Sequence, residues 1–427
     1  MMIVKSPRRV HAITLGCQMS AADSAETLSA LHRDGWQTAA TPAEADAVVV
    51  TTCAVRRHAE QRALSIIGAL RQWKEADPNR ALVVTGCMAQ RLGWRLNKRF
   101  PHVDFSVGAR AAQKTPQLVA ESLRQRFGIG PSSVAAPASA ATAFVTIMRG
   151  CSCSCSYCIV PAVRGPESCR APEEILAEAR AKVAAGAREI TLLGQRVNAY
   201  LWKEGGRETG FADLLRLVDR VEGLRRLRFM SPHPGLWDDR AMAAFQECPS
   251  VCAWLHMPVQ SGCDRILELM RRGYTRADYL RMIERVRRAA PHVVLSTDII
   301  VGFPSETEEE FVQSLTLLED IRPATAFCFK YSAREATPAA ALPDDVPPQL
   351  KEERLARLNA LVDRLTRETL AAQVGGVVEV LAETPTFGRT RTGFKVRWER
   401  MVAPGSLVSV RINAATRRTL LGDIHEP

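Results

Sequence analysis

The sequence predicts an α/β protein in three parts: an amino-terminal open parallel α/β sheet domain, a central partial (β/α)6 TIM-like barrel and a small carboxy-terminal antiparallel β-barrel. Three observations predict it. Short apolar runs alternate with helical stretches over residues 10–124, six further strand–helix units begin near residue 143, and short alternating strands with glycine turns follow residue 372. At about 150 residues per domain, 427 residues accommodate three such parts.

The first part contains three apolar runs typical of buried parallel strands: VHAITLG (10–16), DAVVVTT (46–52) and ALVVTG (81–86). A polar or amphipathic segment follows each run. This repeated order of strand, turn and helix implies an open α/β sheet. The Pro/Ala/Ser-rich stretch at 130–141 then predicts a linker.

The second part contains six predicted strands, with helices such as 172–186 and 277–290 between them. Six parallel units indicate a partial TIM-like barrel, whose site would lie at the carboxyl ends of its strands. A Pro-rich loop (338–348) and a charged helix (350–371) close this part. The predicted strands are 143–149, 189–194, 224–230, 253–259, 293–302 and 324–331.

The third part changes character at about Ala372. Strands of alternating pattern are predicted at 377–383, 394–398 and 407–413, and they indicate a small antiparallel barrel.

Composition excludes several protein classes. A hydrophobic content of 46% and a charged content of 24% are ordinary globular values and exclude a disordered chain. The sequence start has no apolar stretch long enough for a signal peptide, and no segment approaches about 18 uninterrupted apolar residues. We therefore expect a cytoplasmic protein with no membrane partner, in which twelve cysteines serve metal or redox chemistry rather than disulfides.

The net charge of +11 is concentrated in one segment of the chain, residues 56–126, rather than spread evenly along it. Residues 56–126 carry 14 Lys and Arg against 5 Asp and Glu. A basic surface of this kind suits a polyanionic partner.

The densest cysteine cluster is RGCSCSCSYCIVP, directly after the first predicted barrel strand. Cys151, Cys155 and Cys158 are spaced C-x3-C-x2-C, and three thiolates can hold three irons of a 4Fe-4S cube while the fourth iron stays open to a bidentate ligand. Cys153 lies in the same loop, so ligand sets that include Cys151 with Cys153, or Cys153 with Cys158, are also possible. Tyr157 beside the last cysteine favours the set of Cys151, Cys155 and Cys158. The cluster could also consist of chance cysteines, or it could bind zinc, for which no fourth ligand is obvious nearby.

A second cysteine pattern lies upstream. Cys17, Cys53 and Cys87 end the three predicted strands of the first part, in TLGC, TTC and TGC. The carboxyl ends of neighbouring strands in an open α/β sheet converge on one crevice, so these side chains can meet although some 35 residues separate them. Each could instead be a small buried apolar side chain. Three in equivalent positions favour a shared site.

The C-x3-C-x2-C spacing with an aromatic residue before the last cysteine resembles the radical S-adenosylmethionine superfamily. The upstream triad resembles the amino-terminal domain of the methylthiotransferase family, which holds an auxiliary 4Fe-4S cluster. The resemblance covers almost the whole chain, with GCQMSAADS, TTCAVRRHAEQRA, GCMAQR, RGPESCR, LLGQRVNAY, HMPVQSG, DIIVGFPSET and YSAREATPAA in the family's order. GRTRTGFKV and LLGDI in the tail resemble a TRAM domain, a small RNA-binding barrel.

The resemblance implies three domains. Residues 8–124 would form the methylthiotransferase amino-terminal domain, 137–369 the radical S-adenosylmethionine core and 372–427 the TRAM domain. GCQM and CAVR are most similar to the family's MiaB branch, which makes 2-methylthio-N6-dimethylallyladenosine beside the tRNA anticodon, at position 37. Ser20 and Thr51 stand where asparagines are usual, and Cys169 where serine is usual; these departures flank the auxiliary cluster or the nucleotide site.

The implied reaction is radical sulfur insertion into N6-dimethylallyladenosine followed by methyl transfer. One S-adenosylmethionine would give the radical and another the methyl group, while the protein positions both. Methylthiolation of threonylcarbamoyladenosine in tRNA or of a ribosomal protein is an alternative. A non-catalytic iron–sulfur RNA-binding protein is another, which two cysteine triads disfavour.

The family's cofactors, two 4Fe-4S clusters and S-adenosylmethionine, imply a set of ligands in this sequence. Short polar groups and a glycine at the barrel strand ends suit an adenosine and its carboxylate. No catalytic residue is assigned beyond the clusters, and His233 and His256 are expected to be structural. The implied cluster ligands are Cys17, Cys53 and Cys87 for the auxiliary cluster and Cys151, Cys155 and Cys158 for the other. The implied S-adenosylmethionine contacts are Tyr157, Gln195, Asn198, Gln260, Ser261, Asp298 and Gly302.

The expected partners are the tRNA anticodon stem-loop, an electron donor such as flavodoxin or ferredoxin, and a sulfur donor, acting on a monomer. In the tail, a basic group clusters around one predicted hairpin, and phosphate contacts dominate nucleic-acid affinity. Phe394 and Trp398 lie near these charges and suit either base stacking or the core. The expected RNA-binding residues are Arg389, Arg391, Lys395 and Arg397. The cysteines expected to be buried and inert are Cys248, Cys252, Cys263 and Cys328.

Overall fold

The computed structural model describes residues 7–128 and 140–426, so most of the predicted linker at 130–141 lies outside the described residues. The chain divides into two compact units. The first comprises residues 1–137, 149–153 and 158–167, and the second comprises residues 138–148, 154–157 and 168–427. Within the described ranges, no helix has the length and apolar character needed to cross a membrane.

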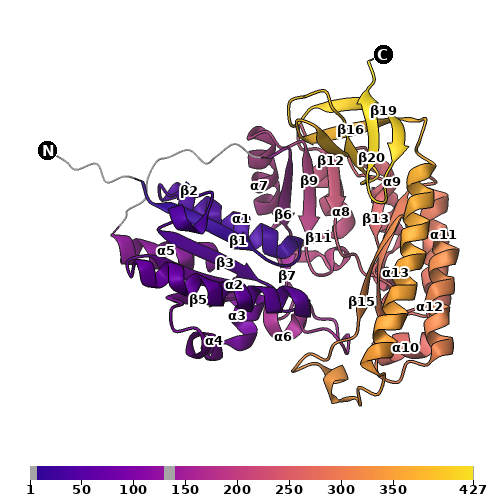
Figure 1. The fold of residues 1–427 in the computed structure, drawn as a ribbon. Coiled ribbons are helices and arrows are strands. Elements are labelled where there is room, and N and C mark those ends of the chain that lie inside the picture. Colours follow the sequence, from indigo (N-terminus) through magenta and orange to yellow (C-terminus); the bar gives the residue numbers. More distant parts are fainter. Residues whose placement is uncertain (1–6, 129–139, 427) are drawn as a thin grey trace. The chain divides into compact units, whose positions relative to one another are not determined.

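The first unit contains a five-stranded parallel sheet in the order β2-β1-β3-β4-β5 (Figure 1). The three predicted strands are β1, β3 and β4, and every side chain of β3 and β4 is buried. The sequence pattern misses the edge strands because both residues of β2 are exposed and none of the four residues of β5 is fully buried. The strand bounds are β1 Arg9–Thr14, β2 Gln37–Thr38, β3 Ala47–Thr52, β4 Ala81–Gly86 and β5 Phe105–Gly108.

Helices cover both faces of this sheet. Val48 and Val50 of β3 pack with Ile67 of α2 on one face, whereas Val49 packs with Leu123 of α5 on the other. This division follows from the alternation of side chains along a strand. The helix bounds are α1 Gln18–Arg33, α2 Arg57–Ala76, α3 Cys87–Leu92, α4 Trp94–Arg99, α5 Thr115–Phe127 and α6 Val160–Arg164.

The second unit contains the six predicted parallel strands. They form two three-stranded sheets, β12-β9-β6 and β13-β14-β15, and one parallel bridge joins Leu227 of β12 to Val251, just before β13. The strands therefore neighbour one another in chain order, which confirms the partial (β/α)6 arrangement. Their bounds are β6 Thr142–Thr146, β9 Glu189–Leu193, β12 Arg226–Phe229, β13 Trp254–His256, β14 Val294–Val301 and β15 Thr325–Lys330.

Helices separate these strands along the chain. Thr275 and Thr307 begin α11 and α12 with capping boxes, in which Asp278 and Glu310 return the hydrogen bond. The helix bounds are α7 Pro172–Ala184, α8 Phe211–Asp219, α9 Asp239–Glu247, α10 Asp264–Leu269, α11 Arg276–Ala289, α12 Glu308–Ile321 and α13 Pro348–Ala371. The remaining short strands are β7 Met148–Arg149, β8 Ser168–Cys169, and the hairpin β10 Leu201–Glu204 with β11 Arg207–Gly210.

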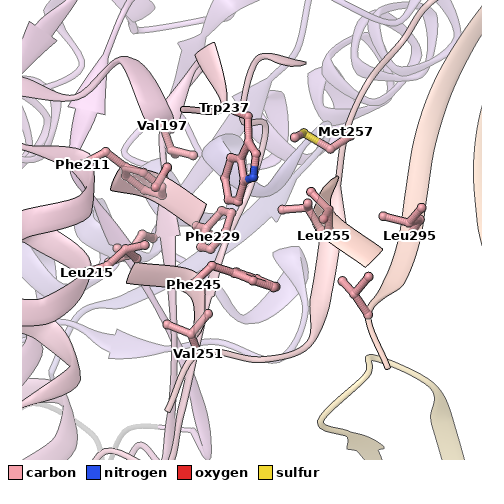
Figure 2. Packing of buried hydrophobic residues seen from close by; sticks show 14 of the residues in the cluster. Val197, Phe211, Leu215, Phe229, Trp237, Phe245, Val251, Leu255, Met257 and Leu295 are labelled. Atoms are coloured by element: carbon pink, nitrogen blue, oxygen red, sulfur yellow. The ribbon is translucent and has the colours of Figure 1, made fainter. Parts of the chain in front are cut away.

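A group of aromatic side chains lies within the mainly aliphatic core of the second unit (Figure 2). Phe229 of β12 meets Phe211 of α8 edge-on at 5.2 Å between ring centroids and stacks on Trp237 at 5.8 Å. Such pairs contribute about 0.5–1.5 kcal/mol beyond their buried area. This packing holds the strands whose carboxyl ends carry the candidate nucleotide contacts.

The tail forms the predicted closed barrel, in the order β16-β17-β18-β20-β19. Its pairs are antiparallel except for β18 with β20, which is parallel. Buried Arg226 of β12 donates to the carbonyl oxygen of Arg389 at 2.6 Å and pairs with Glu379 at 2.9 Å, so the barrel is anchored to the central strands. The bounds are β16 Val377–Thr384, β17 Phe387–Thr390, β18 Lys395–Arg397, β19 Leu407–Ala415 and β20 Leu420–Ile424.

Candidate iron–sulfur and nucleotide sites

Three cysteines lie at one edge of the amino-terminal sheet. Cys17 immediately precedes α1 after strand β1, Cys53 follows β3, and Cys87 begins α3 directly after β4. Because β1, β3 and β4 are parallel neighbours, their carboxyl ends lie side by side. The sheet therefore places the three residues at one crevice.

The chain approaches itself closely around these cysteines. Gly16 has a φ of +134°, and a Cβ there would lie 2.6 Å from Cβ of Cys53, so only glycine fits. A hydrogen bond with Cys53 holds the pKa of Cys17 well below its usual range and raises the pKa of Cys53. Burial raises the pKa of the Cys87 thiol, and the charge of Cys87 contributes to the raised pKa of Cys53. The structure thus brings the three thiols together.

These residues suit a 4Fe-4S cube. Among the described residues, no three His, Cys, Asp or Glu side chains converge on a single metal ion. A cube does not require such convergence, because each thiolate binds a different iron. Three sulfur donors, two of them buried, match the soft ligands that iron–sulfur clusters select.

The second cysteine group lies in the loop before α6. A Cβ at Gly150, whose φ is +77°, would collide with the carbonyl oxygen of Pro166, so glycine lets this loop fold back. The Cys153 amide donates to Sγ of Cys151 at 3.4 Å, and hydrogen bonding with Cys153 lowers the pKa of Cys151 while the nearby Cys158 raises it. In the second unit, Cys155 accepts a hydrogen bond from Arg272 at 3.3 Å.

Arg272 is a buried residue that sequence reasoning misses. Its guanidinium contacts Sγ of Cys155, the Tyr274 hydroxyl at 2.9 Å and the carbonyl of Pro258 at 2.9 Å, and it reaches the Tyr157 hydroxyl at 3.5 Å. Burial alone would lower the pKa of Arg272, but Tyr157, Tyr274 and Cys155 raise it well above its usual range. No spacing signal identifies it, because it approaches the cysteine loop from the turn after α10.

Two of the candidate nucleotide contacts, Gln260 and Asp298 of β14, are joined by a backbone hydrogen bond. Gln260, at a φ of +80°, donates its backbone N–H to the carbonyl of Asp298 at 2.8 Å. The Asp298 carboxylate lies 3.5 Å from Nε2 of His256, whose Nδ1 contacts Ser296 at 2.8 Å. Ser261 is fully buried, and its hydroxyl accepts from the amide of Cys263 at 3.2 Å.

The contacts predicted after β9 differ from each other. The Asn198 side chain is hydrogen-bonded to the backbone of His233. Its amide nitrogen donates to the His233 carbonyl at 2.9 Å, and its oxygen accepts from the His233 N–H at 2.7 Å. Burial, with the charges of Arg272 and Arg196, lowers the pKa of His233 to about 3, so it is neutral there. Oε1 of Gln195 is buried, and no described residue bonds to it, which leaves it available to a ligand.

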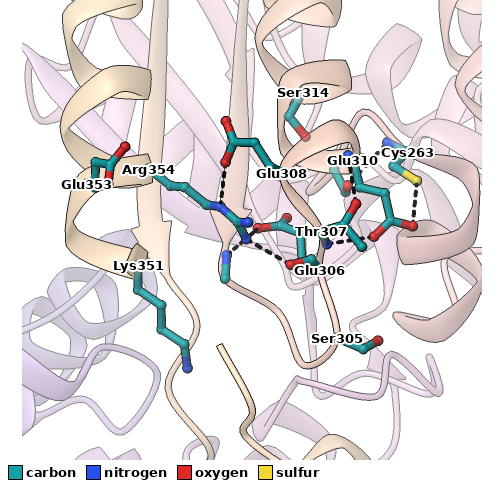
Figure 3. A network of polar contacts seen from close by, with 12 residues as sticks. Cys263, Ser305, Glu306, Thr307, Glu308, Glu310, Ser314, Lys351, Glu353 and Arg354 are labelled. Atoms are coloured by element: carbon teal, nitrogen blue, oxygen red, sulfur yellow. Dashed lines mark hydrogen bonds and ion pairs between the residues drawn. The ribbon is translucent and has the colours of Figure 1, made fainter. Parts of the chain in front are cut away.

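Gly302 directly follows β14 and contacts a buried ion pair that sequence reasoning does not predict. Figure 3 shows this pair, formed by Glu306 and Arg354. The Gly302 amide donates to Glu306 at 2.6 Å, and Glu306 pairs with buried Arg354 at 3.0 Å. Burial raises the pKa of Glu306 to about 7, against the opposing effect of these two partners. A Cβ on Gly302, whose φ is +66°, would collide with Lys351, so the strand end must be glycine.

The basic residues of the tail have different surroundings. Arg389 pairs with Glu383 at 3.3 Å, and the Arg397 guanidinium lies 5.9 Å from the ring centre of Phe387. Arg391 donates to the carbonyl oxygens of Pro249 and Val251, so it also anchors the barrel to the central strands. Lys395 is exposed.

The aromatic residues and the remaining cysteines lie mostly in cores. Trp398 is buried in the core of the tail barrel, and Phe394 packs against that core. Cys328, expected from the sequence to be buried, is half-buried, as is Cys169. The remaining cysteines are buried: Cys248, Cys252 and Cys263.

Comparisons place the chain among known proteins. The profile described as "Uncharacterized protein family UPF0004" matches residues 9–108, and the Radical SAM superfamily profile matches residues 145–318. The tRNA-2-methylthio-N(6)-dimethylallyladenosine synthase of Thermobifida fusca is 42% identical, covering 96% of this chain and 88% of the relative. The synthase of the same name from Syntrophobacter fumaroxidans is 40% identical, covering 98% of this chain and 96% of the relative.

Solved structures share the fold at low identity. The radical S-adenosylmethionine methyltransferase TsrM from Kitasatospora setae, with cobalamin and a [4Fe-4S] cluster bound, superposes with a TM-score of 0.56 at 14% identity, covering 78% of this chain and 77% of that one. The cobalamin-dependent radical enzyme OxsB superposes with a TM-score of 0.52 at 11% identity, covering 84% and 56%.

The near-full-length relatives decide the family. Identities of 40% or more over nearly the whole chain far exceed the likeness to the solved structures, which concerns the fold alone. The chain therefore belongs to the radical S-adenosylmethionine superfamily and, within it, to the methylthiotransferase family of the tRNA-2-methylthio-N(6)-dimethylallyladenosine synthases.

Proposed function

We propose that this protein converts N6-dimethylallyladenosine beside the tRNA anticodon, at position 37, to its 2-methylthio derivative. The observation that carries the proposal is the 42% identity over 96% of the chain to a synthase of that product. The meeting of Cys17, Cys53 and Cys87 at one sheet edge supports it, because the reaction needs a second cluster besides the radical one.

The two cysteine triads would hold two 4Fe-4S clusters. Cys151, Cys155 and Cys158 leave one iron open for S-adenosylmethionine, and the upstream triad holds the auxiliary cluster. When bound, the clusters and S-adenosylmethionine supply the radical and the methyl group, which no side chain of the protein can supply. The chain binds and orients them and presents the adenine unstacked.

The strand ends of the second unit would enclose S-adenosylmethionine. Buried Oε1 of Gln195 would accept a hydrogen bond from the nucleotide, and the positive-φ turns at Gln260 and Gly302 would let the backbone approach it closely. Asn198 and Ser261 would act mainly by holding their loops, since their polar atoms contact neighbouring backbone. Asp298, within β14, and Tyr157, in the cysteine loop, would present further polar groups to the nucleotide.

The remaining assignments complete the proposal. Residues 8–124 would form the auxiliary-cluster domain, 137–369 the radical core and 372–427 the RNA-binding TRAM domain. We propose a cytoplasmic monomer that receives electrons from a flavodoxin or ferredoxin and sulfur from a separate donor.

Mass spectrometry of tRNA nucleosides from a deletion strain tests the proposal. We expect N6-dimethylallyladenosine to accumulate and its 2-methylthio derivative to disappear. The gene for the full chain should restore the product, and the gene for a Cys155→Ser variant should not.

Three results of this experiment would contradict the proposal. Loss of the methylthio group from threonylcarbamoyladenosine, or from a ribosomal protein analysed in parallel, would assign a different substrate. Unchanged nucleosides and ribosomal proteins would favour a non-catalytic iron–sulfur RNA-binding protein.

Exposed basic residues of the tail should contribute to tRNA capture. Residues 372–427 carry eight Lys and Arg against five Asp and Glu. We expect the Lys395→Gln/Arg397→Gln double variant to weaken tRNA binding and to flatten the dependence of log K on log salt by about 0.7–0.9 per lost phosphate contact. Filter binding of tRNA at several salt concentrations measures both effects.

A matched control separates this hairpin from general charge. Arg411→Gln removes one exposed positive charge from β19, outside the hairpin, and should change the slope less. Equal slopes for the double variant and the unaltered protein would assign RNA capture to the basic 56–126 segment instead. Arg391→Ala is a poorer probe because it also removes the contacts with Pro249 and Val251.

A further inference from the structure

A short helix that follows Cys158 packs beside the auxiliary triad, Cys17, Cys53 and Cys87. Helix α6 begins two residues after Cys158. Ile159 and Val163 pack with Cys87 in one apolar cluster, and Arg110 donates to the Ala162 carbonyl at 2.9 Å. These contacts fix the end of the helix, Arg164, beside the auxiliary triad.

Arg164 is buried there, and one nitrogen of its guanidinium has no hydrogen-bond partner among the described residues. Its side chain is 4% exposed, and its NH2 donates to the Asp23 carboxylate at 2.8 Å. NH1 is buried, and no residue in the described part of the chain bonds to it. A buried N–H without a partner destabilises the fold, more so on a charged group, so an unused donor at this depth requires an explanation.

Cys17 and Cys87 are the neighbours of this guanidinium besides Asp23. The positive charge of Arg164 lowers the pKa of both thiols, and it also hydrogen-bonds to Cys87. The Asp23 carboxylate orients the guanidinium from the other side and is itself bound by Arg149, which pairs with Glu26 as well. Arg164 is therefore oriented by Asp23 beside Cys17 and Cys87, and one nitrogen of its guanidinium has no partner among the described residues.

We propose that NH1 of Arg164 donates a hydrogen bond to a sulfur of the cluster held by Cys17, Cys53 and Cys87, and that its charge stabilises the reduced form of that cluster. The inference rests on the proposed assignment of this triad. Hydrogen bonds to the sulfurs and nearby charge set the reduction potentials of iron–sulfur clusters. A cation favours the more negative, reduced state, so Arg164 raises the potential.

The test uses the full chain with Cys151, Cys155 and Cys158 replaced by alanine, so that the auxiliary cluster alone is loaded. After anaerobic reconstitution, iron and sulfide are counted, and the midpoint potential is measured by redox titration followed by electron paramagnetic resonance. In Arg164→Gln we expect the potential to fall by about 59 mV or more, which is tenfold in the one-electron equilibrium. Arg149→Gln is the matched control, because it removes the other arginine of Asp23 and should shift the potential less.

The variants distinguish the outcomes. A shift in Arg164→Gln no larger than that in Arg149→Gln overturns the inference. If Arg164→Gln loads no cluster, Arg164→Lys decides, because it keeps the charge without the planar fork. A midpoint potential of Arg164→Lys below that of the parent protein, which keeps Arg164, supports the inference. A midpoint potential of Arg164→Lys equal to that of the parent overturns it.

The proposed function can fail separately from this inference. The potential is measured without tRNA, so an unshifted potential leaves the methylthiotransferase assignment intact. Failure of the parent protein, with Arg164 present, to load any iron would instead overturn the assignment of the upstream triad, on which the proposed function depends.

Discussion

Replacing Cys17, Cys53 and Cys87 together with alanine should halve the iron content, from about eight to about four per chain, because each 4Fe-4S cluster holds four irons. Cleavage of S-adenosylmethionine to 5′-deoxyadenosine should persist, since the proposed radical cluster uses other ligands. Formation of the methylthio product should stop. Iron and sulfide analysis with chromatography of the nucleoside products measures all three.

The matched control for this experiment changes cysteines outside both triads. Half-buried Cys169 and Cys328 can be replaced by alanine and should leave about eight irons. If the triple variant loses S-adenosylmethionine cleavage, the two triads do not have separate roles. If it keeps all its iron, the upstream triad holds no cluster.

Cys155→Ser should abolish the cluster that opens to S-adenosylmethionine, and cleavage should fall to the uncatalysed background. Cys155 accepts a hydrogen bond from buried Arg272, which indicates a sulfur held in place rather than a solvent-facing thiol. A serine hydroxyl is a much poorer iron ligand than a thiolate. Absorbance of the reconstituted protein and production of 5′-deoxyadenosine measure the loss.

Cys153→Ser is the partner experiment, and it should retain full iron content and activity. The contact of Cys153 with Sγ of Cys151 comes from its backbone N–H, which serine also has. A serine hydroxyl can replace the hydrogen bond that the Cys153 side chain gives to Cys151. Loss of the cluster in this variant, with retention in Cys155→Ser, would shift the ligand assignment to Cys153.

Several of the predicted strands that the structure confirms have buried apolar runs. Strands β3 and β4 have only buried side chains, and such runs are visible in the sequence. Edge strand β2 has two exposed residues, and strand β17 has four residues of mixed burial, so neither has a distinct pattern. The parallel pairing of β18 with β20 joins segments separated by the whole of β19, and no local signal indicates it.

The convergence of Cys17, Cys53 and Cys87 could be predicted because it follows from strand order alone. Each cysteine lies at the end of a buried run, and parallel neighbours align those ends. The roles expected of Asn198 and Arg391 could not be predicted in the same way. Their side chains contact the backbones of His233 and Val251, which lie 35 and 140 positions away.

The sequence by itself therefore determined the family, the α/β class, the six-unit order and the convergence of Cys17, Cys53 and Cys87, because these depend on local pattern and spacing. Only the tertiary structure placed Arg164 beside the upstream triad and Arg272 beside Cys155, and only it paired Glu306 with Arg354. Arginine is common on protein surfaces, and its role depends on what lies within reach of its long side chain. That environment is assembled by residues far apart in the chain, so it exists only once the chain has folded.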